Sequence, residues 1–209
     1  VNIVASMIFS GVSGSAVADT SAVGSVLIPA MKKEGYHSAY AAAVTAASST
    51  IGPIIPPSIP FVIFGLLTNT SIGDLFLAGI VPGVLMGGFL LMASYIISVR
   101  RQYPAHSRAS IKVVAGSFVD AFLALLMPAI ILGGITTGIV TPTESGVVAV
   151  AYGIFIGLFV YKGFKFRDLP RILLDSILNS GMILIIIATT GLFTYLIADM
   201  RAGEVLVKF

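Results

Sequence analysis

The chain has 209 residues, of which 57% are hydrophobic and only 10% are charged, and its formal net charge is +3. Soluble domains carry about 25% charged residues, so this composition excludes a soluble globular protein and indicates that lipid surrounds much of the chain. The small net charge argues against a nucleic-acid-binding protein. The absence of Cys excludes disulfides, thiolate metal sites and Cys nucleophiles.

The first apolar stretch, residues 1–31, is interrupted at its centre by small polar residues between Gly11 and Thr20. A continuous spanning helix needs no such run of Gly and Ser. Non-helical backbone at membrane depth is tolerated only where protein buries it or where it lines a cavity. We therefore expect a re-entrant helical hairpin that enters and leaves on the cytoplasmic side. Because the sequence begins and ends inside apolar segments, we also expect it to be a fragment of a longer membrane protein.

Residues 36–67 form a second interrupted stretch. As one helix it would be about 48 Å long at a rise of 1.5 Å per residue, too long for a hydrocarbon core of about 30 Å. Its middle contains four prolines: Pro53, Pro56, Pro57 and Pro60. Proline removes an amide donor and pushes the preceding residue out of the helical region. The pattern predicts two half-helices joined by an extended stretch.

Four later segments are long and apolar enough to cross a bilayer, which takes about 20 residues: residues 75–99, 118–139, 143–161 and 172–198. The positive-inside rule places loops rich in Lys and Arg in the cytoplasm. Three short loops carry these residues: Lys32 and Lys33; Arg100, Arg101, Arg108 and Lys112; Lys162, Lys165, Arg167 and Arg171. Residues 68–74 would then lie outside, and the chain is an all-helical polytopic membrane protein.

Oxygen donors are concentrated in the two interrupted elements. Secondary transporters bind cations at unwound carbonyls and anions at the N-termini of half-helices. We therefore predict a sodium and carboxylate site, with oxygens from Ser13, Ser15, Asp19, Thr20, Ser49 and Thr50 and from the backbone of Gly52 and Pro53. Serines in membrane helices also serve close packing, and a carboxylate at the position of Asp19 can cap a helix. Both alternatives remain open.

A further motif begins at Thr141. With Thr141 as N-cap, Pro142 at the first helical position, Thr143 next and Glu144 third, the sequence predicts a capping box. A direct ion or coupling role for Glu144 is the alternative. On the preceding span, Gly79, Gly83 and Gly87 predict a close-packing face for another helix, in this chain or a partner. No Ser/His/Asp or paired-carboxylate arrangement supports hydrolase chemistry, so we do not expect an enzyme.

Five strings resemble, in this order, the large membrane subunit of TRAP (tripartite ATP-independent periplasmic) transporters: residues 11–20, 28–36, 49–58, 71–83 and 133–144. The resemblance implies an elevator-type fold of the ion-transporter superfamily in the bacterial inner membrane. Residues 1–67 would be part of the transport domain, with the hairpin at 1–31 and the broken helix at 36–67. Residues 68–112 would form a transmembrane helix and basic cytoplasmic loop. Residues 113–209 would lead toward a second repeat beyond Phe209.

The same resemblance implies sodium-coupled import of an organic acid, of sialic acid or C4-dicarboxylate type. A periplasmic binding protein would deliver the substrate, and a small four-helix membrane subunit would be a partner. Sodium would be the coupling ion, with no other cofactor. The substrate carboxylate would contact Ser13, Ser15 and Ser58. The sodium ion would lie among Ser15, Asp19, Thr20, Ser49, Thr50, Gly52 and Pro53. The alternatives are a sodium/carboxylate symporter that needs no binding protein, and a structural subunit that does not transport.

Overall fold

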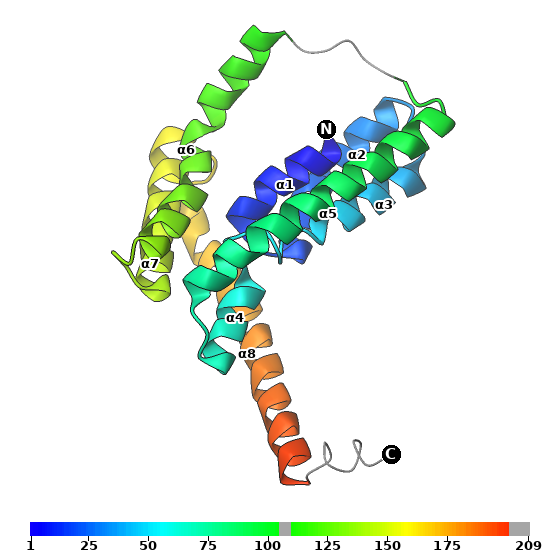
Figure 1. The fold of residues 1–209 in the computed structure, drawn as a ribbon. Coiled ribbons are helices and arrows are strands. Elements are labelled where there is room, and N and C mark those ends of the chain that lie inside the picture. The colour runs from blue at the N-terminus through cyan, green and yellow to red at the C-terminus, as the bar shows by residue number, and fades with distance from the viewer. Residues whose placement is uncertain (105–109, 201–209) are drawn as a thin grey trace. The chain divides into compact units, whose positions relative to one another are not determined.

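The computed structural model describes residues 1–104 and 110–200, and within them the chain is helical with connecting turns (Figure 1). Two units are distinct, residues 1–156 and residues 157–209. The helices of the first unit are α1 Asn2–Ser13, α2 Ala16–Lys33, α3 Ser38–Ser49, α4 Ile59–Thr68, α5 Ile72–Arg100, α6 Ile111–Thr136 and α7 Pro142–Phe155. A π-helical turn, Ile156–Val160, a 3-10 turn, Phe166–Asp168, and α8, Leu169–Asp199, follow.

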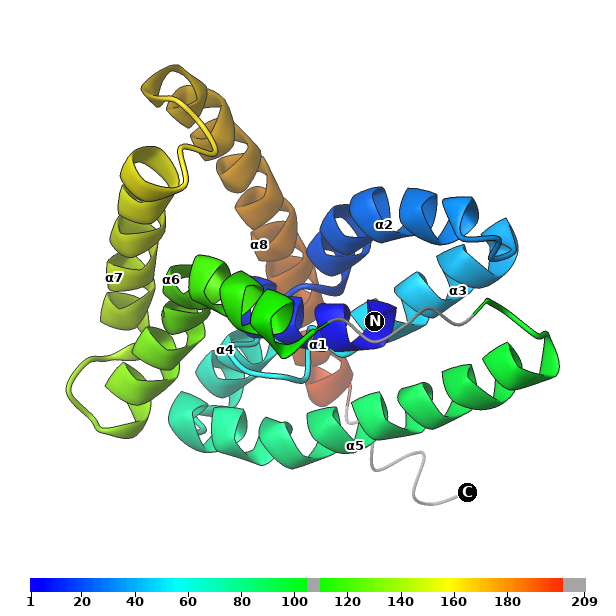
Figure 2. The same cartoon turned by 90° about the horizontal axis from the view of Figure 1, so that it is seen from above.

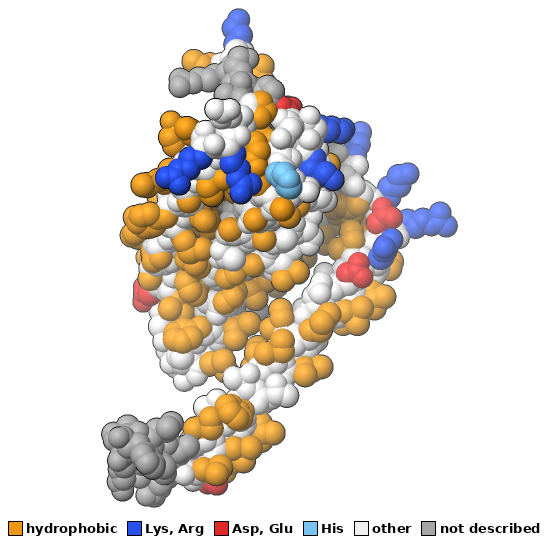
Figure 3. Space-filling view, turned by 90° about the vertical axis from the view of Figure 1, so that its right-hand side faces the viewer, with side chains coloured by type: hydrophobic (Ala, Val, Ile, Leu, Met, Phe, Trp, Pro, Cys, Tyr) orange, Lys and Arg blue, Asp and Glu red, His pale blue; other side chains and the backbone are white. Residues whose placement is uncertain are grey.

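Four helical segments are long and apolar enough to span a membrane: Ile72–Arg100, Ile111–Thr136, Pro142–Val160 and Phe166–Ile197. They confirm the four predicted spans and the all-helical polytopic class. Hydrophobic side chains cover much of the face seen in Figure 3. Lys32 and Lys33 stand in the last turn of α2, and Arg100 in that of α5. Arg108, placed by the sequence in a cytoplasmic loop, lies outside the described residues. The boundaries at residues 67 and 112 stay predictions.

In the region of the hairpin predicted for residues 1–31, α1 and α2 are joined by a two-residue turn; that the hairpin enters and leaves on one side of the membrane stays a prediction. Gly14 ends α1 in the left-handed region with φ 61°, and its amide donates to the carbonyl of Ser10. Ser15 is extended and its hydroxyl caps α2 by accepting from the amide of Ala18. Glycine adopts this left-handed conformation without the steric cost that a Cβ imposes. The turn is therefore sharp enough to bring α2 back along α1.

The break predicted in residues 36–67 is confirmed, but its predicted extended form is wrong. α3 ends at Ser49, and α4 begins at Ile59 behind the N-cap Ser58. Between them the chain makes successive turns, in which the carbonyl of Ile51 accepts from the amides of Ile54 and Ile55. The first three residues after α3 are not prolines, so each of them keeps its N–H group. These N–H groups can still donate to carbonyls that come earlier in the chain. The break is compact, not extended.

α5 lies along the group formed by α1, α3 and α4 (Figures 1 and 2). Its three predicted close-packing glycines are buried against this chain. A Cβ on Gly79 would overlap the carbonyl oxygen of Ile54 and the ring of Phe61, and one on Gly83 would meet the side chain of Ile55. At Gly87 it would meet Met7 of α1. The glycine face of α5 therefore packs against the break and the hairpin. The segments that it contacts belong to this chain.

Replacing Gly79 with Ala should destabilise the protein, because the new methyl group would push against the backbone of the break. Overpacking a close contact typically costs about 1–3 kcal/mol. Gly88 is on the same helix and has open space around its Cβ position, so Gly88→Ala should be neutral or slightly stabilising through helix propensity. Thermal unfolding in detergent checks the pair. Equal Tm values for the two variants would show that the glycine contact with the break is not needed.

Candidate functional site

The tip of the hairpin meets the break. The amide of Ile59 donates to the carbonyl of Gly14 at 3.3 Å, which joins the start of α4 to the end of α1. A Cβ on Gly14 would overlap the carbonyl oxygen of Pro57, so the two backbones are in direct contact. Ser15 at the start of α2 and Ser58 at the start of α4 are thus brought to one region. Each helix start carries free amides and a partial positive charge.

Asp19 lies next to this region and is fully buried. Its carboxylate accepts from the hydroxyl of Ser10 at 2.7 Å on Oδ2 and from the hydroxyl of Ser13 on Oδ1. Residues 1–31 and 38–99 contain no Lys, Arg or His, so these helices offer no cationic side chain to it. An ionised carboxylate buried without a basic partner is costly. A bound cation at this carboxylate would offset that cost. The N-cap of α2 is Ser15. Asp19 is therefore not the residue that caps this helix.

The break approaches Oδ2 of this carboxylate. A Cβ on Gly52 would lie 2.5 Å from Asp19 Oδ2 and 3.2 Å from the carbonyl oxygen of Ser49. The hydroxyl of Ser49 itself is buried and donates to the carbonyl of Thr45 at 2.8 Å. A hydroxyl that donates keeps its acceptor lone pairs, so both the carbonyl and the hydroxyl oxygen of Ser49 stay candidate ligands. Among the described residues no three of His, Cys, Asp and Glu cluster as ligands, so a cation here would be held by one carboxylate, hydroxyls and carbonyls, the hard oxygens that sodium takes.

Thr20 and Thr50 lie on exposed faces, and their place in the sodium site stays a prediction. Both are exposed, and their hydroxyls donate to their own helices, Thr20 to the carbonyl of Ala16 at 2.8 Å and Thr50 to that of Ala47 at 2.7 Å. Together with Ser21 they line a separate open hollow between α2 and α3. Successive residues of a helix point about 100° apart. Thr20, which follows the buried Asp19, therefore lies on a different face of α2.

The three serines predicted for the substrate are close together, and each already has a partner. Ser13 donates to Asp19 and accepts from the amide of Ser15 at 3.2 Å. Ser58 donates to the carbonyl of Pro53 at 2.6 Å and accepts from the amide of Phe61. Ser13 and Ser58 line one cavity of about 180 Å³, whose other walls are mainly apolar. Ser15 lies outside it.

Ser10 is the contact that the sequence did not reveal. It is fully buried and donates to Asp19, yet it stands one turn before the predicted tip. The available signal was the spacing of Asn2, Ser6, Ser10 and Ser13, which recur every three or four residues and therefore share a face of α1.

The motif at Thr141 forms a capping box at the start of α7. The amide of Glu144 donates to the hydroxyl of Thr141 at 3.3 Å, and the amide of Thr141 donates to Glu144 Oε2 at 2.8 Å. Pro142 occupies the first turn, where its missing N–H costs nothing. Thr141, Thr143 and Glu144 are exposed. The box therefore accounts for these residues structurally, and a coupling role remains a separate question.

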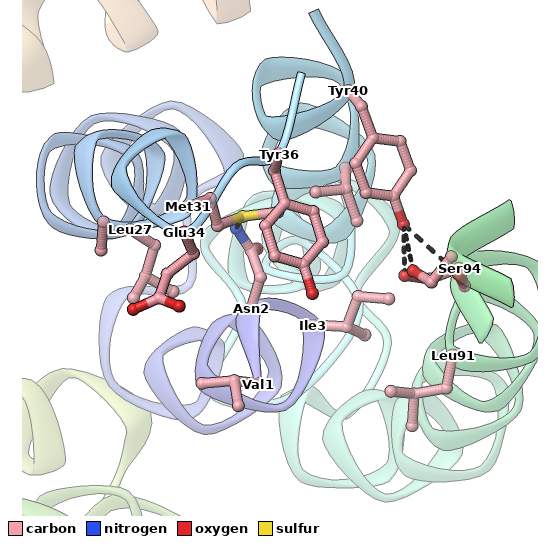
Figure 4. Close-up of a pocket in the computed structure, with 13 residues that line it drawn as sticks. Val1, Asn2, Ile3, Leu27, Met31, Glu34, Tyr36, Tyr40, Leu91 and Ser94 are labelled. Carbon is pink, nitrogen blue, oxygen red and sulfur yellow. Dashed lines mark hydrogen bonds between the residues drawn. The ribbon is translucent and has the colours of Figure 1, made fainter. Parts of the chain in front are cut away.

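A second cavity, of about 340 Å³, lies at the other end of α1 from Gly14 (Figure 4). Asn2, Met31, Tyr36, Tyr40 and Ser94 are among its lining residues. The hydroxyls of Tyr40 and Ser94 are 2.7 Å apart, which ties the start of α3 to α5. The rings of Tyr36 and Tyr40 both lie against that of Tyr103, which follows α5. These contacts join the start of α3 and the turn before it to α5 and to the residues that follow α5.

Comparison of the sequence with known proteins identifies a family for the chain. The model of the family described as tripartite ATP-independent periplasmic transporter, DctM component, matches residues 1–208. The chain is 42% identical, over 99% of its length, to the sialic acid TRAP transporter permease protein SiaT of Haemophilus influenzae, of which it covers 34%. It is 40% identical to the large permease protein SiaM of Vibrio cholerae over 100% of the chain and 49% of that protein.

A third relative has a different named substrate. The C4-dicarboxylate TRAP transporter large permease protein DctM of Pseudomonas aeruginosa is 40% identical over 97% of this chain and 47% of that protein. The chain thus spans between a third and a half of the length of these relatives. The hairpin, the break and Asp19 all lie within the matched residues.

Proposed function

The chain belongs to the DctM component family of the TRAP transporters, and we propose that it forms part of a large permease subunit that imports an organic acid together with sodium. It is a multi-pass protein of the bacterial inner membrane. Residues 1–67 would form part of a transport domain that moves by an elevator-type mechanism. Sodium is transported along with the acid and supplies the driving force as it runs down its gradient.

The observation that carries this proposal is the meeting of the hairpin tip with the break beside a buried carboxylate. Asp19 supplies a negative charge, and the backbone at Ser49 and Gly52 lies next to it. These groups fit a small monovalent cation. The starts of α2 and α4, at Ser15 and Ser58, offer amide dipoles that favour a substrate carboxylate. Because residues 1–31 and 38–99 contain no basic side chain, the dipoles, the hydroxyls and the sodium ion would together balance the charge of the substrate.

The substrate proposal follows the relatives. Two of the similar proteins are named for sialic acid and one for C4-dicarboxylates, and all these substrates carry a carboxylate. Their identities to this chain are 40–42% and do not separate the two classes. We propose sialic acid as the first substrate to test. The partners would be a small four-helix membrane subunit and a periplasmic binding protein that delivers the acid.

Uptake in proteoliposomes tests the proposal. The permease, reconstituted with the small subunit, should accumulate a labelled carboxylate only with an inward sodium gradient and a binding protein present. Sialic acid, a C4-dicarboxylate and a keto acid form the panel, and choline replaces sodium in the control. Equal uptake in choline would rule out sodium coupling. Uptake without any binding protein would favour a binding-protein-independent symporter, and no uptake of any acid under any gradient would favour a structural subunit.

A further inference from the structure

Ser10 holds a position that differs from those of the predicted ligands. Its hydroxyl oxygen is 2.7 Å from Asp19 Oδ2 and 2.7 Å from the carbonyl oxygen of Ser6. A hydroxyl has one proton to donate, and the bond to an ionised carboxylate is the stronger of these two choices. Oδ2 is also the carboxylate oxygen that faces Gly52 of the break. Ser10 therefore contacts the oxygen that is turned toward the candidate cation ligands.

Behind Ser10 lies a buried polar seam, which we define as Asn2, Ser6, Thr45 and Ser48. The hydroxyls of Ser6 and Ser48 are 2.8 Å apart, the amide nitrogen of the Asn2 side chain donates to Thr45 Oγ1 at 2.8 Å, and all four side chains are buried. Every buried side-chain nitrogen and oxygen among the described residues has a partner. The seam fixes α1 on α3, and so it fixes where the hydroxyl of Ser10 stands.

We propose that Ser10 is a positioning residue of the cation site: it holds Oδ2 of Asp19 against the break and acts on the ion only through that carboxylate. The inference rests on the proposed sodium coupling. Without the hydroxyl, Oδ2 loses its only hydroxyl donor among the described residues while it stays buried. A carboxylate that is free to rotate presents its charge to the ion less well. The expected consequence is weaker binding of sodium with a fold that is largely kept.

The experiment measures sodium binding in two ways, with the permease and its small subunit purified together. One readout is the rise in Tm with sodium concentration at constant ionic strength, with choline as the replacement ion, because an ion that binds only the folded state raises Tm. The other is the sodium concentration for half-maximal uptake in proteoliposomes. Ser10→Ala should raise both sodium midpoints by about 10- to 100-fold, the weight of one hydrogen bond to a charged group. The KM for substrate at saturating sodium should change much less.

Two variants separate positioning from packing. Ser6→Ala removes an equally buried hydroxyl one turn earlier that bonds to Ser48 and not to Asp19, so it should lower Tm and move the sodium midpoints far less than Ser10→Ala does. Ser10→Cys keeps nearly the same volume but supplies only a weak donor, so its midpoints should move as in Ser10→Ala. Wild-type midpoints in Ser10→Ala or Ser10→Cys would overturn the positioning role. A wild-type protein whose Tm and uptake ignore sodium would instead overturn the proposed function, and the inference with it.

Discussion

Replacing Asp19 with Asn is expected to abolish sodium-driven uptake. Asp19 is the only acidic residue in residues 1–31, and residues 38–73 contain none, so no neighbouring carboxylate on these elements replaces it. Asn keeps the volume of the side chain but removes the charge that would face the ion. Losing one member of a buried charge pair costs about 3–5 kcal/mol, which corresponds to a fall in sodium affinity of about 100-fold or more. The loss of transport is measured as the initial rate of labelled carboxylate uptake under a sodium gradient.

Asp74→Asn is the matched control for that variant. Asp74 also stands in the first turn of a helix, α5, but it is exposed. Its loss should cost only the attraction of an acid for a helix start, about 0.3–1 kcal/mol, and uptake should stay close to wild type. The assignment of Asp19 to the cation would be wrong if Asp19→Asn carried out uptake with an unchanged sodium dependence. A fall of both variants alike would point to a general loss of folded protein.

Gly14→Ala should be nearly as damaging, by a route that involves no charge. Gly14 has φ 61°, and a Cβ there would overlap the carbonyl oxygen of Pro57. The left-handed conformation costs a non-glycine residue about 1–2 kcal/mol, and relief of the overlap requires the hairpin tip to move from the break. Because the candidate site is formed by that meeting, we expect uptake to fall about tenfold or more even where the protein still folds.

Gly138→Ala is the control that introduces left-handed backbone strain without a steric overlap. Gly138 also lies in the left-handed region, at φ 71°, but nothing is within 4 Å of its Cβ position. Alanine there should lower Tm by the backbone strain alone and leave uptake at wild-type levels. Thermal unfolding and uptake are measured on both variants. If the two variants lose uptake equally, contact between the tip and the break does not explain the sensitivity of Gly14.

The sequence located the irregular elements well because Gly and Pro act on the backbone locally. The run of Gly and Ser between Gly11 and Thr20 and the four prolines after residue 52 correctly predicted a hairpin and a break. Local signals do not say which faces meet. The sequence places Thr20 beside Asp19, whereas the hydroxyl of Thr20 bonds to the carbonyl of Ala16 and not to that carboxylate. The sequence does not single out Ser10, whose buried hydroxyl contacts Asp19. The predicted extended form of the break is also wrong, because the amides that follow α3 donate to earlier carbonyls and so form turns.

The polar seam has a consequence for how the protein reaches the membrane. The buried side chains of α1 at Asn2 and Ser6 find their hydrogen-bond partners mainly on α3, at Thr45 and Ser48. Unpaired, these groups are costly in lipid. We therefore expect α1 to reach its final position in the membrane only once α3 is in place to supply these partners.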